Sequence, residues 1–175
     1  MPRPPVIGAL AVALALIAVA CSSSKKSTPP TSAAASSAAA PAGAGSPPAV
    51  ANATDLKTAP VISAGTGSPP SALATSDLVV GTGTVAAQTS TVNVQYVGAN
   101  YADGKVFDSS WSRGQPATFP LAQVVPGFAQ GITGMKVGGR REIVIPPALG
   151  YGASGNGPVG PNETLVFVVD LLSVS

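Results

Sequence analysis

Hydrophobic and polar positions divide the chain into stretches of different character. An apolar run from Val6 to Ala20 ends just before Cys21, and residues 22–53 then hold almost no large apolar side chain. Beyond Asp77, short runs rich in β-branched residues alternate with Gly-containing turns, a pattern typical of β-strands. The pattern therefore predicts a leader, a polar linker and one folded domain at residues 77–175.

The folded part contains apolar runs with the alternation or length expected of strands. Val92, Val94 and Tyr96 alternate with Asn or Gln, the period of two that gives a strand one buried face. The run from Leu165 to Leu172 is apolar on both sides apart from Asp170, which predicts a central strand covered on both faces. The predicted strands span residues 78–80, 91–101, 107–109, 141–145 and 164–174.

Turn signals and one short helix connect these strands. Asp103 and Gly104 favour a hairpin turn after the second strand. A helix fits between Pro126 and Ile132, because proline is tolerated at the first helical position, while Gly131 keeps the helix to one or two turns. The pattern predicts an α+β fold in which an antiparallel sheet wraps around one short helix.

Residues 56–76 allow two interpretations. Their larger apolar side chains form either an extra edge strand or a part of the tether, and these side chains are Leu56, Val61, Ile62 and Leu73. A Gly-Ser-Pro-Pro stretch at 67–70 is a turn signal that would separate such a strand from the domain. The pattern leaves both interpretations open.

The N-terminal run resembles a bacterial secretory signal that ends in a lipid-attachment cysteine. Arg3 precedes the run, which is shorter than the roughly 20 apolar residues that a membrane-spanning helix needs. Residues 18–21, Ala-Val-Ala-Cys, resemble a lipobox, although alanine stands where Leu, Val or Ile is usual. We expect removal of residues 1–20 and lipidation of Cys21, the chain's only cysteine. The alternative is ordinary secretion after cleavage near Ala20.

Residues 21–55 would then connect the lipid to the domain. This segment consists mainly of Ser, Ala, Pro, Gly and Thr, so it cannot bury enough apolar surface to offset the entropy of ordering. Proline stiffens such a chain, whereas Gly and Ser loosen it. The composition predicts a disordered, semi-flexible spacer.

Composition excludes several classes of function. Charged residues make up 9% of the chain, the net charge is +2, and no basic run is long enough to follow phosphates, so nucleic acid is not an expected partner. The chain has no histidine, which removes a Ser-His-Asp triad, an imidazole base and a histidine ligand for zinc. A single cysteine also excludes an internal disulfide or a multi-thiolate metal site.

A series of motifs in the domain carries a family resemblance. They are VQYVG at 94–98, DGKVFDSS at 103–110, VVPGF at 124–128, MKVG at 135–138, IPP at 145–147, LGYG at 149–152 and TLVF at 164–167. In order and spacing they resemble FKBP-type peptidyl-prolyl cis-trans isomerases. The resemblance implies a half-barrel of five or six antiparallel strands around a short helix, with an apolar cleft that binds proline-containing polypeptides without a cofactor or metal.

The resemblance also implies site residues, although strand aromatics and valines are more often plain core than site. Catalytic roles would fall to Tyr96, Phe107, Asp108, Val125, Tyr151 and Phe167. Further substrate contacts would come from Val124, Phe128, Arg113 and Val159. Arg113 and the Tyr96 hydroxyl would pair with Asp108 and keep its carboxylate ionised. The Tyr151 hydroxyl and the Val125 amide would bind substrate carbonyls.

Three positions depart from the family pattern. Phe128 stands where many members have tryptophan, Ala117 replaces an aromatic wall, and Asn156 stands where histidine is common. The first two predict a wider cleft, so macrolides such as tacrolimus or rapamycin are expected to bind weakly. We expect a monomeric, extracytoplasmic isomerase held at the bacterial membrane by Cys21. The alternative is an FKBP-fold chaperone or binding module with little turnover.

Overall fold

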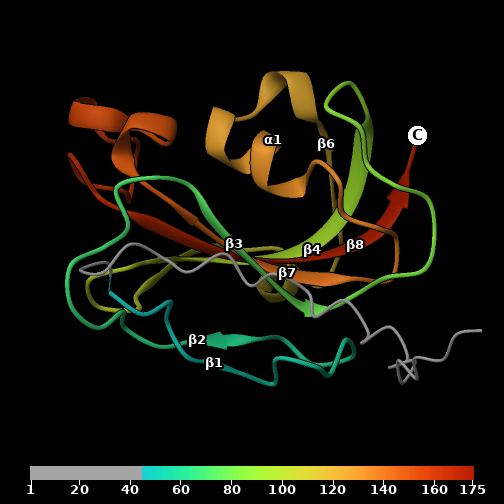
Figure 1. Ribbon diagram of the computed structural model, residues 1–175, viewed down its shortest axis with the longest axis horizontal. Helices are drawn as coiled ribbons and strands as arrows, with labels where there is room; N and C mark the ends of the chain where they lie inside the picture. The colour runs from blue at the N-terminus through green and yellow to red at the C-terminus, as the bar shows by residue number, and fades with distance from the viewer. Residues whose placement is uncertain (1–44) are drawn as a thin grey trace, which may run out of the picture. The chain divides into compact units, whose positions relative to one another are not determined.

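The computed structural model describes residues 45–175, so the expected leader, the lipid-attachment residue Cys21 and the linker up to residue 44 lie outside the described residues. The main feature is a six-stranded antiparallel sheet in the order β3-β7-β8-β4-β5, with β6 pairing additionally with β4 (Figure 1). Its strands are β3 (Ala74–Val79), β4 (Thr91–Asn100), β5 (Val106–Ser109), β6 (Ala117–Pro120), β7 (Arg140–Ile145) and β8 (Leu165–Val174). The predicted antiparallel α+β fold is confirmed.

The predicted central strand lies in the middle of the sheet. β8 pairs with β4 on one side and with β7 on the other, and Leu165 to Leu171 are all buried. Apart from Asp170, the run lacks polar positions because both faces are covered. β6 was not predicted, since Ala117–Pro120 is short, ends in proline and is only half-buried. It is nevertheless ordered, with Phe119 directly opposite Val92 of β4.

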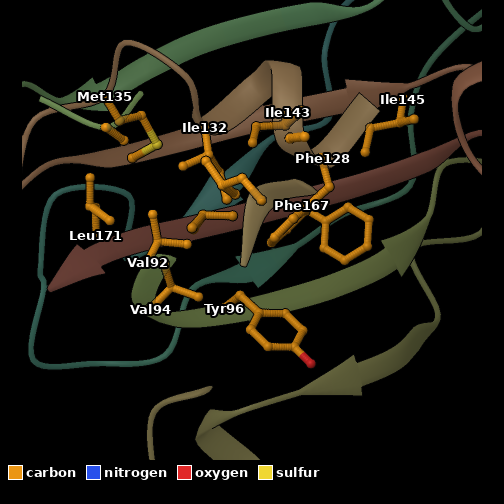
Figure 2. Packing of buried hydrophobic residues seen from close by; sticks show 14 of the residues in the cluster. Val92, Val94, Tyr96, Phe128, Ile132, Met135, Ile143, Ile145, Phe167 and Leu171 are labelled. Atoms are coloured by element: carbon orange, nitrogen blue, oxygen red, sulfur yellow. The ribbon is translucent and has the colours of Figure 1, made fainter. Parts of the chain in front are cut away.

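Helix α1 (Pro126–Ile132) packs across one face of the sheet, which we call the inner face (Figure 1). The helix has the bounds that the sequence predicts, with proline at its start. Its contact with β7 depends on glycine, because a Cβ on Gly131 would lie 2.5 Å from Cγ2 of Ile143. Phe128 and Ile132 of the helix enter the main core (Figure 2). Among residues 45–175, no helix has the length and apolarity needed to cross a membrane.

Residues 45–66, which we call the strap, cover the opposite, outer face of the sheet. The strap contains β1 (Val50–Ala51) and β2 (Val61–Ile62), which pair antiparallel beneath the main sheet (Figure 1). Ile62 is 5% exposed and joins a second hydrophobic cluster on the outer face. The other buried residues of that cluster are Val97, Ala99, Tyr101, Val144, Val166 and Val168.

A buried ion pair fixes the strap to the sheet. Arg140 is fully buried, and its Nη2 lies 2.7 Å from Oδ2 of Asp170. The same guanidinium group donates to the carbonyl of Asn52 and, at 3.1 Å, to the carbonyl of Thr58. The strap therefore supplies the remaining acceptors that a buried guanidinium requires.

The strap changes two domain boundaries. Residues 45–55 belong to the folded domain, which corrects the expectation of a disordered linker as far as residue 55. Within 56–76, Ile62 lies in the outer-face core and β3 begins at Ala74, ahead of the expected domain start at 77. The physical reason is that this segment buries few apolar side chains of its own, and its ordering depends on hydrogen bonds from distant Arg140.

Candidate active site

A cavity of about 630 Å³ lies between the inner face of the sheet, the start of α1 and the loop that follows β7. Its walls come from Tyr96, Phe107, Asp108, Phe119, Gln123, Val124, Val125, Phe128, Tyr151, Asn156, Pro158, Val159 and Phe167. All the expected site residues of the domain except Arg113 thus line this one cavity. Arg113 is connected to this wall through Asp108 and Tyr96.

Aromatic rings form most of the apolar lining. The ring centroids of Phe128 and Phe167 are 5.0 Å apart at an interplanar angle of 68°, and those of Phe107 and Phe167 are 5.5 Å apart at 82°. Edge-to-face arrangements of this kind are favoured by the ring quadrupoles. Phe128 is 5% and Phe167 6% exposed, so both rings are core residues and cavity walls at once. Figure 2 shows Tyr96, Phe128 and Phe167 converging from β4, α1 and β8.

Gly98 of β4 makes room for this aromatic wall. A Cβ on Gly98 would lie 2.8 Å from Cζ of Phe107 and 2.8 Å from Cε1 of Phe167. These separations are far below van der Waals contact, so a larger residue would push the two rings out of place. The glycine in the VQYVG motif therefore has a direct role in the shape of the cavity.

Asp108, Tyr96 and Arg113 form a polar network at the cavity edge. The Tyr96 hydroxyl donates to one carboxylate oxygen of Asp108, and Nη1 of Arg113 donates to the other. Nη2 of Arg113 also donates to the Tyr96 hydroxyl at 2.8 Å, and its guanidinium carbon lies 5.6 Å from the Tyr96 ring centroid. The Ser109 amide donates a third hydrogen bond to Asp108 at 2.8 Å.

This network shifts the pKa of two of its members in opposite directions. The pKa of Tyr96 is raised to about 12, chiefly by burial and also by the hydrogen bond to Asp108. Burial alone would also raise the pKa of Asp108, but the hydrogen bonds from Tyr96 and Arg113 outweigh it and lower the pKa below its usual value. At neutral pH Asp108 is therefore an anion and Tyr96 a neutral donor.

Val125 and Tyr151, which are expected to bind substrate carbonyls, both belong to the cavity lining. Val125 is the residue before α1, and its carbonyl accepts hydrogen bonds from the amides of Phe128 at 3.0 Å and Ala129 at 3.2 Å. Tyr151 lies between two short 3-10 turns, Pro147–Leu149 and Gly152–Ser154, and is half-buried. Both residues line the cavity from segments outside the sheet.

Sequence reasoning missed several lining residues. Phe119, Gln123 and Pro158 contribute to the wall, whereas Ala117, from which we expected a wider cleft, does not line it. Phe119 instead supplies an aromatic wall, with its centroid 5.7 Å from that of Tyr96. The available signal was the spacing of two between Ala117 and Phe119, which places both side chains on one face of a strand.

The antiparallel sheet, its short helix and the aromatic cavity define an α+β domain, and no histidine or cysteine is among the residues that line this cavity. Comparison with known proteins gives the family. The model of the FKBP-type peptidyl-prolyl cis-trans isomerase family matches residues 83–172, and the chain belongs to this family. It carries the FKBP-type isomerase domain that the motifs indicate.

Individual relatives agree with this assignment. The chain is 48% identical over 101 residues to a probable FK506-binding protein of Corynebacterium glutamicum, covering 58% of this chain and 86% of that protein. It is 50% identical over 106 residues to an FK506-binding protein of Streptomyces anulatus, with the same coverage of 58% and 86%. It is 45% identical over 95 residues to the outer membrane protein MIP of Legionella longbeachae, covering 54% of this chain but only 40% of that protein.

Solved structures show the same similarity. The crystal structure of FkpA from Escherichia coli matches with a TM-score of 0.57 and 43% identity, covering 59% of this chain and 48% of that one. The crystal structure of AtFKBP13 matches with a TM-score of 0.56 and 38% identity, covering 61% of this chain and 95% of that one. The strap lies outside the residues matched by the family model.

Proposed function

We propose that the cavity is the active site, and that it rotates X–Pro bonds in extracytoplasmic proteins. The observation that carries this proposal is an aromatic cavity whose one acidic wall residue, Asp108, is already paired with Tyr96 and Arg113. Such a site offers neither an unpaired acid nor a nucleophile, so it suits a reaction in which no covalent bond is broken.

Rotation about an X–Pro bond requires the loss of amide resonance. The barrier is about 18–20 kcal/mol, and the uncatalysed event takes tens to hundreds of seconds. The planar amide is more dipolar than the twisted amide, so water stabilises the ground state more than the transition state. Transfer into an apolar cavity removes this preferential solvation and lowers the barrier.

The cavity walls take separate roles in this proposal. Phe107, Phe167 and Phe128 hold the pyrrolidine ring, with Val124 and Val159 filling the remaining apolar contacts. The Tyr151 hydroxyl and the Val125 amide hold the neighbouring carbonyls, so that one side of the amide stays fixed while the other turns.

The paired carboxylate of Asp108 keeps Tyr96 and Arg113 in place at the edge of the cavity. It also presents a fixed negative charge to the twisting amide. No metal or cofactor is required for these steps.

A paired assay separates catalysis from simple holding of unfolded chains. The full chain is tested on a short X–Pro peptide and on refolding of a protein limited by proline isomerisation, each with and without tacrolimus. An isomerase accelerates both reactions, and tacrolimus suppresses both. Improved refolding without any acceleration of the peptide would instead support the chaperone function and overturn catalysis in the cavity.

We further propose that the cavity binds macrolides such as tacrolimus or rapamycin, but weakly. The similarity to proteins named FK506-binding protein supports binding. Phe128 offers a smaller ring than tryptophan, which reduces the contact area. Calorimetric titration of the full chain with tacrolimus measures the affinity, and submicromolar or tighter binding would contradict the expected weakness.

We also propose that Cys21 is lipidated and that the monomeric domain works outside the cytoplasm. The leader pattern supports this, as does the similarity to the outer membrane protein MIP. Metabolic labelling with palmitate in the native host should mark the wild type and leave Cys21→Ser unlabelled. Equal labelling of both proteins would end the claim and leave ordinary secretion.

A further inference from the structure

Ser110 has an unusual set of hydrogen bonds for a residue that touches neither the cavity nor solvent. It directly follows β5 and is fully buried, with 0% exposure. Its hydroxyl oxygen accepts the amide of Tyr96 at 2.7 Å and donates to the side-chain oxygen of Gln95. Its own amide donates to the Tyr96 carbonyl at 3.0 Å, and its carbonyl accepts the Arg113 amide at 3.1 Å.

These bonds connect every segment that carries the polar network. Asp108 lies two residues before Ser110 in β5, and Arg113 ends the 3-10 turn Trp111–Arg113 that begins just after it. Tyr96 lies in β4, the strand that pairs with β5. The β4–β5 ladder ends at the Val97–Ser109 pair, so the bonds of Ser110 replace the next step of the ladder.

We propose that Ser110 is a positioning residue that sets the relative placement of Tyr96, Asp108 and Arg113. The inference rests on the proposed function of that network. Only a small hydroxyl side chain can accept an amide proton and donate to Gln95 while fitting a site with no exposed surface. Alanine at this position would leave the buried Tyr96 amide without its acceptor and would remove the donor to the half-buried Gln95 oxygen.

We expect the loss of the Ser110 hydroxyl to shift the Tyr96 backbone relative to β5. The Tyr96 hydroxyl lies at the far end of its side chain, so a small change at the backbone moves the donor that Asp108 uses. A loosened network weakens the hydrogen bonds that lower the pKa of Asp108. Ser110 thus acts on catalysis through other residues and contacts no substrate itself.

The test compares Ser110→Ala with Ser112→Ala in the full chain. Ser112 belongs to the same turn and donates to the Ser109 carbonyl at 2.8 Å, but its side chain makes no hydrogen bond to Tyr96, Asp108 or Arg113. We expect Ser110→Ala to lower kcat/KM by about tenfold, the loss associated with one buried hydrogen bond. The pKa of Asp108, followed by carboxyl carbon NMR, should rise towards its ordinary value. Ser112→Ala should change neither quantity.

The NMR titration needs no activity, so it separates this inference from the proposed function. If the wild type lacks isomerase activity but Ser110→Ala still raises the pKa of Asp108, the proposed function is rejected and the positioning role is kept. An unchanged Asp108 pKa and kcat/KM in folded Ser110→Ala would overturn the inference. If that variant does not fold, Ser110→Cys decides in the same way, since a thiol keeps the shape but bonds weakly.

Discussion

The hydroxyl of Tyr96 donates to the carboxylate of Asp108, and the two residues sit on neighbouring strands at the edge of an aromatic cavity. The pair links sheet geometry to site chemistry, because each residue changes the protonation of the other. Asp108 raises the pKa of Tyr96, while Tyr96 lowers the pKa of Asp108.

Asp108→Asn should lower the pKa of Tyr96 from about 12. The amide keeps the shape of the carboxylate but removes the negative charge and the strong acceptor, which together disfavour the phenolate. Burial still raises the pKa, so we expect a partial return towards the ordinary tyrosine value. Carbon NMR of labelled tyrosine rings measures it. Asp103→Asn, in an exposed turn, is the control. An unchanged Tyr96 pKa in Asp108→Asn would contradict the coupling.

Asp170→Asn should destabilise the protein far more than Asp77→Asn. Asp170 pairs with fully buried Arg140, whereas the side chain of Asp77, which pairs with Arg141, is 42% exposed. Removing one partner of a buried pair costs about 3–5 kcal/mol, whereas an exposed pair contributes about 0–1 kcal/mol. Urea unfolding of the full chain measures both changes.

The same variant should loosen the strap. The amide of Ser63 donates to the carbonyl of Ala49 at 2.9 Å within the strap, and its protection depends on the strap staying docked. Hydrogen exchange of this amide should quicken in Asp170→Asn and stay unchanged in Asp77→Asn. Equal protection in the two variants would show that the ion pair does not hold the strap.

Glu142 should make the protein less stable as the pH rises from about 4.5 to about 7. It is 3% exposed on the outer face of β7, and burial raises its pKa from 4.5 to about 7. Between these values the folded state holds a proton that the unfolded state has lost, so stability falls with increasing pH. The full effect is on the order of 3 kcal/mol.

Glu142→Gln removes this titration while keeping the size of the side chain. The free energy of unfolding of Glu142→Gln minus that of the wild type should be larger at pH 8 than at pH 4.5. Urea unfolding of both proteins at the two pH values measures this difference. Parallel pH dependence in the two proteins would mean that Glu142 does not carry the effect.

Gly98→Ala should impair catalysis by displacing the Phe107 and Phe167 rings. The added methyl group would stand 2.8 Å from an atom of each ring. Overpacking typically costs about 1–3 kcal/mol, so the protein should still fold. We expect lower kcat/KM and weaker tacrolimus binding, measured by the peptide assay and by calorimetry. Wild-type values for both would show that the cavity tolerates the shift.

Local pattern predicted the parts of the fold whose residues carry their own signal. The alternation around Val94 gave β4, and the proline start and glycines gave α1. The family motifs then indicated which aromatic residues would line a cavity, something that alternation alone could not separate from ordinary core. Phe128 and Phe167 explain why, since each serves as core and wall together.

The strap could not be predicted because its partners are distant in sequence. Arg140 looks like a surface charge in the sequence, yet it is buried and binds the carbonyls of Asn52 and Thr58. The one available signal was Asp170, a carboxylate inside an otherwise apolar strand, which requires a buried cation. β6 escaped prediction for a similar reason, since Phe119 is ordered by β4 and by neighbouring rings.

NMR exchange spectroscopy of an X–Pro peptide with catalytic amounts of the full chain tests the central claim most directly. We expect the cis/trans exchange rate to rise in proportion to the protein concentration, well above the uncatalysed timescale of tens to hundreds of seconds. Saturating tacrolimus should return the rate to the uncatalysed value, since we propose that the macrolide binds in the same cavity. An uncatalysed rate in the presence of folded wild-type protein would contradict the account.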